Sequence, residues 1–263
     1  MITRLEKNQR LGRVGSYVER MQAIDSLELR MLVGRQRADQ SEPGDAETFR
    51  LLQSAQALQE KLAAANERLY ARLIRSIRLR NWPVVRERLR AVEAQSARTA
   101  DPDCLQYDEL DTLVNGLLAV NSAPAEPEPR DADVIGYQPT PVRIVLRLVD
   151  ELRLASRDTF YDLGSGLGHV PILINLFTGI KAKGIELEQS YHRYAVACLD
   201  KLGLTNVEFI NADARQAAYD DGTVFYLYSP FQGETLHHVL RRLAARPNVA
   251  LSESALSARV PCR

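Results

Sequence analysis

The sequence is short of cysteine and tryptophan and has no long apolar run. Its three cysteines, Cys104, Cys198 and Cys262, are widely spaced and follow no metal-ligand pattern, and an odd number argues against a disulfide framework. No apolar stretch approaches the roughly 20 residues that a membrane-spanning helix needs. The charged N-terminus, residues 1–13, differs from a signal peptide. We therefore expect a protein of the reducing cytoplasm with no metal site.

The formal net charge is zero, but the charges are unevenly distributed along the chain. Residues 1–100 hold 19 Lys and Arg against 12 Asp and Glu, a net charge of +7, and residues 101–263 hold 15 against 22, a net charge of −7. The composition is otherwise that of a globular protein, with 45% hydrophobic and 26% charged residues in 263. The chain is therefore expected to contain two units that attract each other or face different partners.

Helical periodicity dominates the basic half. Apolar residues recur every three or four positions, which predicts helices over residues 16–38, 46–80, 84–97 and 106–120. Four arginines, Arg68, Arg72, Arg75 and Arg78, share one face of the second helix. This face is either an anion-binding surface, a solvated surface or a surface that docks on the acidic half. Few aromatic residues accompany it, so nucleic acid is not the favoured partner, and a homodimer through the N-terminal helices is a further expectation.

A proline-rich stretch separates the two halves. Residues 121–130 contain three prolines and only alanine as a core-forming residue, which indicates an extended linker. We therefore divide the chain into a helical N-terminal domain over residues 1–120, a linker over 121–135 and a second domain over 136–263. Just after the linker, Thr140 is expected to cap a helix over residues 142–152, with Pro141 as its first residue.

A run of glycines follows the first expected strand of the second domain, residues 159–163. Gly164, Gly166 and Gly168 interrupt the chain before an apolar segment of helical length. A strand that breaks at glycines and restarts as a helix presents backbone N–H groups to a ligand. The third glycine comes one residue too early for the dinucleotide pattern G-x-G-x-x-G. Asp162 would repel a pyrophosphate but suits a cationic group, and the alternative is a turn that binds nothing.

These residues, DLGSGLG over 162–168, resemble the first motif of class I S-adenosylmethionine-dependent methyltransferases, and within them the non-SET histone-lysine methyltransferases and their bacterial relatives. The resemblance spans about residues 136–231. It implies an α/β, doubly wound, Rossmann-like sheet, preceded here by the all-α helical domain. Strands are expected over residues 159–163, 181–186, 206–210, 223–228 and 248–251. Few residues follow the last of these, so either other segments complete the family's sheet or its final strands are missing.

The resemblance also implies where the cofactor, S-adenosylmethionine, binds. Asp162 would hold its ammonium, Glu186 its ribose hydroxyls and Asp213 its adenine, although Asp213 suits a helix N-cap equally well. The other residues of the implied cofactor site are Tyr137, Thr140, Gly164, Ser165, Gly166, Gly168 and Ala214. The four histidines, His169, His192, His237 and His238, are interpreted as structural.

The acceptor side of the resemblance is partial. Residues 228–231 stand where amino-group methyltransferases have Asn or Asp followed by two prolines and an aromatic residue. Pro230 and Phe231 fit this motif, whereas Tyr228 replaces the amide or acid and Ser229 follows it. The acceptor atom stays open between oxygen, a protein nitrogen and a small molecule, and no catalytic base is assigned.

Two functional hypotheses follow from the sequence. The first is an S-adenosylmethionine-dependent methyltransferase that works by proximity and orientation and has a protein side chain or a small molecule as its acceptor. The second is a non-catalytic binding or interaction protein with the same fold, which works through its helical N-terminal domain.

Overall fold

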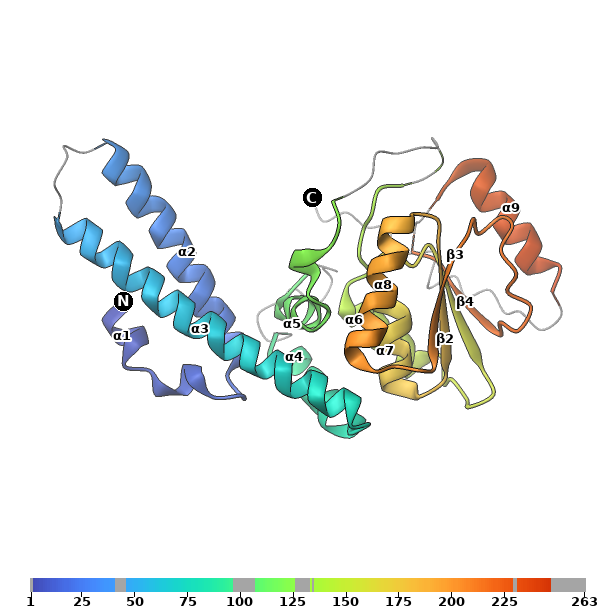
Figure 1. Cartoon of the computed structure of the whole chain (residues 1–263), viewed down its shortest axis with the longest axis horizontal. Helices are drawn as coiled ribbons and strands as arrows, with labels where there is room; N and C mark the ends of the chain where they lie inside the picture. The colour runs from blue at the N-terminus through green and yellow to red at the C-terminus, as the bar shows by residue number, and fades with distance from the viewer. Residues whose placement is uncertain are drawn as a thin grey trace.

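The computed structural model describes residues 2–40, 46–96, 107–125, 133, 135–228 and 231–246. A helical hairpin lies at one end of the molecule, a helix-covered sheet lies at the other, and two shorter helices stand between them (Figure 1). No helix of the described ranges has the length and apolar character needed to cross a bilayer.

The hairpin consists of α2 (Tyr17–Gln40) and α3 (Ala46–Arg78), with α1 (Ile2–Glu6) and the 3-10 helix η1 (Gln9–Gly12) beside it. Its own core joins Ile24, Leu27 and Met31 of α2 to Leu58 and Leu62 of α3, as the helical periodicity predicts. The same periodicity also places Leu32 and Leu51 on the buried stripes, and this is wrong. They are 56% and 52% exposed, because they lie beyond the surfaces on which the two helices meet.

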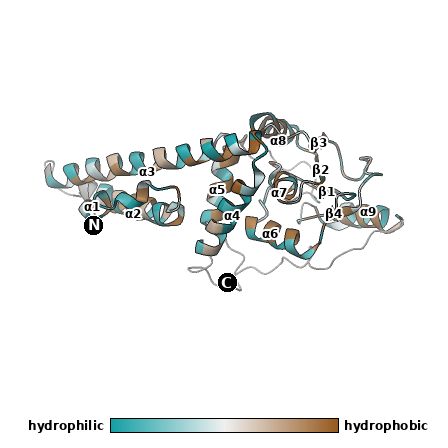
Figure 2. Ribbon diagram, turned by 90° about the horizontal axis from the view of Figure 1, so that it is seen from below, coloured by the Kyte–Doolittle hydropathy of each residue, from teal (hydrophilic) through white to brown (hydrophobic). Residues whose placement is uncertain are grey.

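The long helix α3 continues past the hairpin to reach α8 (Gln189–Leu202) on the sheet (Figure 2). It ends at Arg78, before Arg80 adopts a positive φ of 57°. The next helix, α4 (Trp82–Ser96), begins at Trp82, with Pro83 in its first turn, where a missing N–H costs nothing. Then α5 (Glu109–Leu118) follows, and the predicted break at residues 101–103 lies outside the described residues.

Part of the arginine run joins the helices to the sheet. The Arg78 guanidinium donates to the carbonyls of Asp200 and Lys201 in the last turn of α8, at 3.3 and 3.0 Å. Arg86 donates to the Leu176 carbonyl of α7 (His169–Thr178) at 2.6 Å. Cations at helix C-termini satisfy free carbonyls and complement the helix dipole. For these arginines, the docking interpretation is therefore confirmed.

The sheet has four parallel strands in the order β3-β2-β1-β4 within the described residues. Their bounds are β1 (Thr159–Leu163), β2 (Lys181–Glu186), β3 (Val207–Asn211) and β4 (Val224–Tyr226). Helices α6 (Val142–Glu151), α7 and α8 lie on one side of the sheet, and α9 (Gly233–Ala244) lies on the other (Figure 1). This is the expected doubly wound, Rossmann-like arrangement. The expected strand over residues 248–251 lies outside the described residues.

Alternate residues of β1 face the two layers. Phe160 packs with α6, α7 and α8, and the same apolar cluster continues into α3, α4 and α5. Tyr161 and Leu163 face the opposite cluster, which contains Val239 and Leu243 of α9. The core on the first side therefore runs without a break from the helical half into the sheet. The 3-10 helix η2 (Val120–Ser122) follows α5 where a linker is expected, and the division into domains stays a prediction.

The start of α6 differs from the prediction. Pro141 is the cap residue, with the extended ψ of 134°, and the Thr140 side chain makes no capping bond. Instead, Asp111 of α5 accepts the Val142 N–H with Oδ1 at 2.8 Å and the Asp108 N–H with Oδ2 at 2.9 Å. Asp108 in turn forms an ion pair with Arg143. One buried carboxylate thus caps two helices and ties the helical half to the sheet half.

We predict that Asp111→Ala lowers the free energy of unfolding by roughly 1–3 kcal/mol, because two buried N–H groups lose their acceptor. Urea denaturation would measure this loss. Asp111→Asn keeps one acceptor oxygen and should lose less, and Asp200→Ala, which removes an exposed carboxylate, should change nothing. Equal stability of Asp111→Ala and Asp200→Ala would contradict the proposed double cap.

Candidate functional site

The glycine run forms the turn between β1 and α7. Gly164, Gly166 and Gly168 all have positive φ, at 88°, 51° and 86°. A Cβ built on Gly166 would lie 2.3 Å from the Tyr137 ring, so no larger residue fits beneath that ring. The N–H groups of Gly164 and Ser165 donate to the Ile185 carbonyl of β2, which fixes the turn against the neighbouring strand. The result is the bare backbone turn at a helix N-terminus that the sequence predicts.

Asp162 lies at the carboxyl end of β1 and is only 3% exposed. No described residue donates a hydrogen bond to its carboxylate. Burial, together with the nearby charge of Glu186, raises the pKa of Asp162 well above its ordinary value. A buried carboxylate with no donor is energetically unfavourable in the free protein and fits a cationic ligand that would stabilise its charged form.

Glu186 ends β2, beside Asp162. Its Oε2 accepts the Gly166 N–H at 2.7 Å, and its Oε1 accepts the Glu188 N–H at 2.7 Å. Burial raises the pKa of Glu186 despite these two bonds. The carboxylate is therefore held against the glycine turn by backbone donors, with its remaining lone pairs available to hydroxyl groups of a ligand.

Asp213 follows β3, the next strand along the sheet edge. Its carboxylate binds the Arg215 guanidinium, with the closest contact at 2.7 Å, and these bonds lower the pKa of Asp213. Its Oδ1 also accepts the Arg215 N–H at 2.8 Å, so Asp213 caps the turn that contains the buried Ala214. The capping interpretation of Asp213 is therefore confirmed, and adenine binding stays a prediction for a side chain that Arg215 already engages.

The segment before α6 covers the glycine turn. The Tyr137 ring lies over Gly166 and packs against Tyr191 of α8, with ring centroids 5.3 Å apart. Thr140 is buried, and its hydroxyl lies 3.4 Å from the hydroxyl of Tyr226. Tyr226 is the β4 partner of Asp162 in the parallel register. Tyr137, Thr140 and Asp162 thus meet at the same corner of the sheet.

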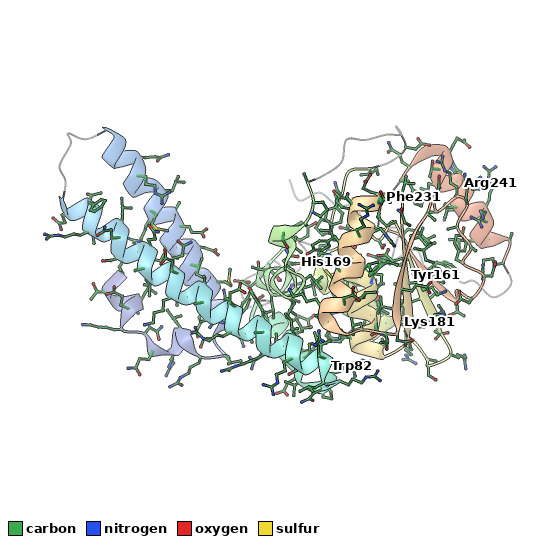
Figure 3. The ribbon with its side chains drawn as sticks, in the orientation of Figure 1. Trp82, Tyr161, His169, Lys181, Phe231 and Arg241 are labelled. Carbon is green, nitrogen blue, oxygen red and sulfur yellow. The ribbon has the colours of Figure 1, made fainter. Side chains whose placement is uncertain are left out.

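His169 is a residue whose place at this site the sequence analysis missed. It is the first residue of α7, is 5% exposed, and lies between the helical half and the sheet (Figure 3). Its Nε2 is 3.0 Å from Oδ1 of Asn115 in α5, and its Nδ1 is 3.4 Å from the Tyr137 hydroxyl. Because the amide oxygen only accepts, Nε2 carries the proton and Nδ1 accepts from Tyr137.

The only sequence signal for His169 is its position directly after the third glycine. Asn115 has none, because its link to the site depends on the packing of α5. Tyr107 was also missed. Its hydroxyl donates to the Pro139 carbonyl at 2.6 Å, so the helical half supports the covering segment at a second point.

The two acceptor-side candidates that the structure describes lie on different sides of the sheet. Tyr228 lies two residues beyond Tyr226, is half-buried, and packs on the α6–α8 side of the sheet, which is also the side of Asp162. Phe231 is buried in the cluster on the α9 side of the sheet. It lies near the carboxyl ends of the strands, at the other end of the sheet from Lys181 (Figure 3). Ser229 and Pro230 lie outside the described residues. Of the two described candidates, Tyr228 is therefore the one that lies on the same side of the sheet as Asp162.

We predict that His169 makes stability depend on pH. Burial lowers the pKa of His169 to about 4, whereas an unfolded histidine titrates near pH 6.5. The unfolded chain therefore binds a proton that the folded protein does not bind, and the contribution of His169 to the free energy of unfolding falls as the pH drops from 6.5 towards 4. The loss should be about 2 kcal/mol at about pH 5 relative to neutral pH.

Urea denaturation at both pH values would test this prediction. His169→Gln should show a smaller pH dependence than the wild type, because Gln keeps a donor and an acceptor but does not titrate. His237→Gln, which changes an exposed histidine of α9, should behave like the wild type. If His169→Gln lost as much stability as the wild type on acidification, His169 would not be the titrating group.

Comparisons with known proteins concern the same part of the chain. Residues 134–217 match the model of the family described as "Histone methylation protein DOT1". A 72-residue stretch is 35% identical to a protein-lysine N-methyltransferase of Saccharolobus islandicus (strain REY15A) and covers 27% of this chain. This match covers 45% of the curated relative, so the chain spans about half the length of that protein.

Two solved structures match part of the chain. An RNA methyltransferase from Salinibacter ruber in complex with S-adenosyl-L-homocysteine is 29% identical, with a TM-score of 0.36 over 40% of this chain and 67% of that one. A methyltransferase from Geobacter sulfurreducens with the same ligand is 26% identical, with a TM-score of 0.35 over 46% and 49% of the two chains. The family match lies within the sheet half of this chain. This half therefore resembles class I S-adenosylmethionine-dependent methyltransferases of the non-SET histone-lysine type.

Proposed function

We propose that the protein is an S-adenosylmethionine-dependent methyltransferase. The observation that carries this proposal is the buried Asp162 carboxylate, which has no donor among the described residues and lies beside a bare glycine turn. A group with a raised pKa in such a place is typical of a ligand site. The family match over the same residues supports the proposal independently.

The residues present fit the three parts of the cofactor. Asp162 would pair with the ammonium, whose positive charge would stabilise the ionised form of this carboxyl group and so offset its raised pKa. Glu186 would accept from the ribose hydroxyls while Gly166 keeps it in place. Asp213 would take the adenine, and Arg215 competes for that carboxylate. Tyr137 and Thr140 would cover the methionine end.

The cofactor supplies a methyl group on a sulfonium centre, which is already activated towards a nucleophile. The protein therefore needs chiefly to orient the acceptor in line and to exclude water. Burial raises the pKa of Tyr228 above that of a free phenol. Tyr228 is consequently neutral at physiological pH, so it can hold an acceptor atom by a hydrogen bond but is a poor general base.

A protein lysine side chain is the acceptor that we propose. The name of the curated relative, a protein-lysine N-methyltransferase, supports this choice, as does the histone-methylation family description. The phenol of Tyr228 can accept a hydrogen bond from an amine in place of the amide found in amino-group methyltransferases. The non-catalytic alternative has less support, because Asp162, Glu186 and the glycine turn lie together at the carboxyl ends of β1 and β2.

We predict that Asp162→Asn weakens binding of S-adenosylmethionine by about 10- to 100-fold, since a charge-assisted bond is lost. Calorimetric titration with S-adenosylmethionine and S-adenosylhomocysteine would measure this change. Asp200→Asn, which neutralises an exposed carboxylate of α8, should bind like the wild type. A folded wild-type protein that binds neither ligand would refute the proposed function.

The same variant should be more stable than the wild type without ligand. The raised pKa of Asp162 means that the fold disfavours its charged form, so the unfavourable contribution is largest at neutral pH and disappears as the carboxyl protonates. Asp162→Asn should therefore unfold at higher urea concentration near neutral pH, and its advantage should shrink on acidification. Loss of both binding and stability would indicate a structural role instead.

We predict that labelled methyl groups are transferred to lysine in protein substrates and that mass spectrometry detects methyl-lysine. Tyr228→Phe removes the hydroxyl and should lower kcat about 10-fold or more, with little change in cofactor affinity. Tyr107→Phe, which removes another phenol near the site, is a matched control for general effects on the covering segment. Methylation confined to RNA or small molecules would refute the lysine proposal but leave the cofactor site intact.

A further inference from the structure

The helix α2 has a second apolar face, opposite the one that forms the hairpin core. Val18 is buried on this second face at the base of the helix, where α2 contacts α4 and α5. Leu29 lies about three turns further along the same face. Leu29, Leu32 and Val33 are 63%, 56% and 39% exposed, so the face continues beyond the part that is covered.

A helix that is apolar on two sides is usually covered on both. On the inner side of α2, Leu27 and Met31 are buried against α3. The outer side is covered by α5 only near its base, where Gln22 donates to Glu109. From Leu29 onward, no described residue covers the outer side, although its apolar character is that of a packed helix.

The charges beside this face identify what would cover it. Glu28 and Arg35 are seven residues apart, so they lie on the same flank of the leucines. Both are exposed, and among the described residues Glu28 accepts a hydrogen bond from the side-chain amide of Gln59. Asp25 and Gln36 bound the leucines at the two ends of the stripe. The acidic group therefore lies towards one end of the stripe and the basic group towards the other.

We propose that this face binds a second copy of the same chain, with the two α2 helices antiparallel. In that register, Leu29 lies opposite Leu32 of the second copy, and Asp25 lies opposite Gln36. Glu28 then lies beside Arg35 of the second copy. The two-fold symmetry repeats this pair at the other end of the contact. In a parallel pair, the two-fold axis would put this flank of the two copies on opposite sides of the contact, so Glu28 and Arg35 would not meet. A two-fold axis requires a self-complementary surface, and the antiparallel pair has one.

This dimer is independent of the proposed function. In Figure 1, α2 lies in the hairpin at the end of the molecule away from the sheet. The glycine turn is formed by β1, β2 and α7, none of which contributes to the α2 face. Variants in α2 should therefore leave the cofactor titration unchanged. A result that refutes the dimer does not refute the proposed function, and the reverse also holds.

Sedimentation equilibrium of the full chain, from micromolar to hundreds of micromolar, tests the proposal. The wild type should dimerise, and Leu29→Glu with Leu32→Glu should be a monomer throughout. Both leucines are exposed, so the fold tolerates these changes. Leu79→Glu is the matched control, because Leu79 is also exposed, at 69%, but lies beyond the end of α3. A monomeric wild type, or a dimer that survives the double change, would overturn the proposal.

Charge reversal tests the register. Arg35→Glu places two carboxylates together at each end of the contact and should weaken the dimer about 10-fold or more. Glu28→Arg in the same chain should restore it, because the pairs are then formed with the charges exchanged. Weakening by Arg35→Glu without recovery in the exchanged chain would refute the antiparallel register.

Discussion

A buried carboxyl group that receives no hydrogen bond from any described residue is the constraint on which the site depends. Asp162 cannot be solvated at the carboxyl edge of the sheet, and Glu186 lies close enough to raise its pKa further. The turn beside them uses positive-φ glycines, and the Tyr137 ring closes over it. Glycine adopts a positive φ without strain, so the unfavourable feature of the free protein is the buried pair of carboxyl groups. Such a feature persists where the rest of the fold is stable enough to hold it, and it marks a place adapted to a ligand.

The helical half is part of this site and not only an attachment to it. Asp111 caps α6, Asn115 fixes the tautomer of His169, and Tyr107 holds the covering segment at Pro139. All three belong to α5 or its immediate N-terminal approach. The apolar cluster that contains Phe160 of β1 also contains Leu110 and Leu113 of α5. The orientation of the Tyr137 ring therefore depends on a helix about 30 residues earlier in the chain.

Local patterns predicted most of the elements correctly, because strands, helices and glycine turns have periodicities that a sequence displays. The glycine turn and the carboxyl-edge acids Asp162 and Glu186 were predicted for this reason. His169 was not, because a histidine at a helix start has the same sequence pattern whether or not Asn115 lies beside it. The cap of α6 was assigned to Thr140 because a distant carboxylate, Asp111, leaves no local signal. The domain boundary raises the same problem, since a core whose members range from Tyr17 to Tyr226 is a long-range property.

The shared core also affects how the protein is made. The apolar surfaces of α3 and α4 around Ile77, Val85 and Leu89 are covered by residues that come much later, including Leu202 of α8. At about 5–20 residues per second, a ribosome needs roughly 6–25 s to go from Ile77 to Leu202. During that interval, the nascent N-terminal helices carry exposed apolar surface, so the first half of the chain cannot complete its folding before the sheet has been synthesised.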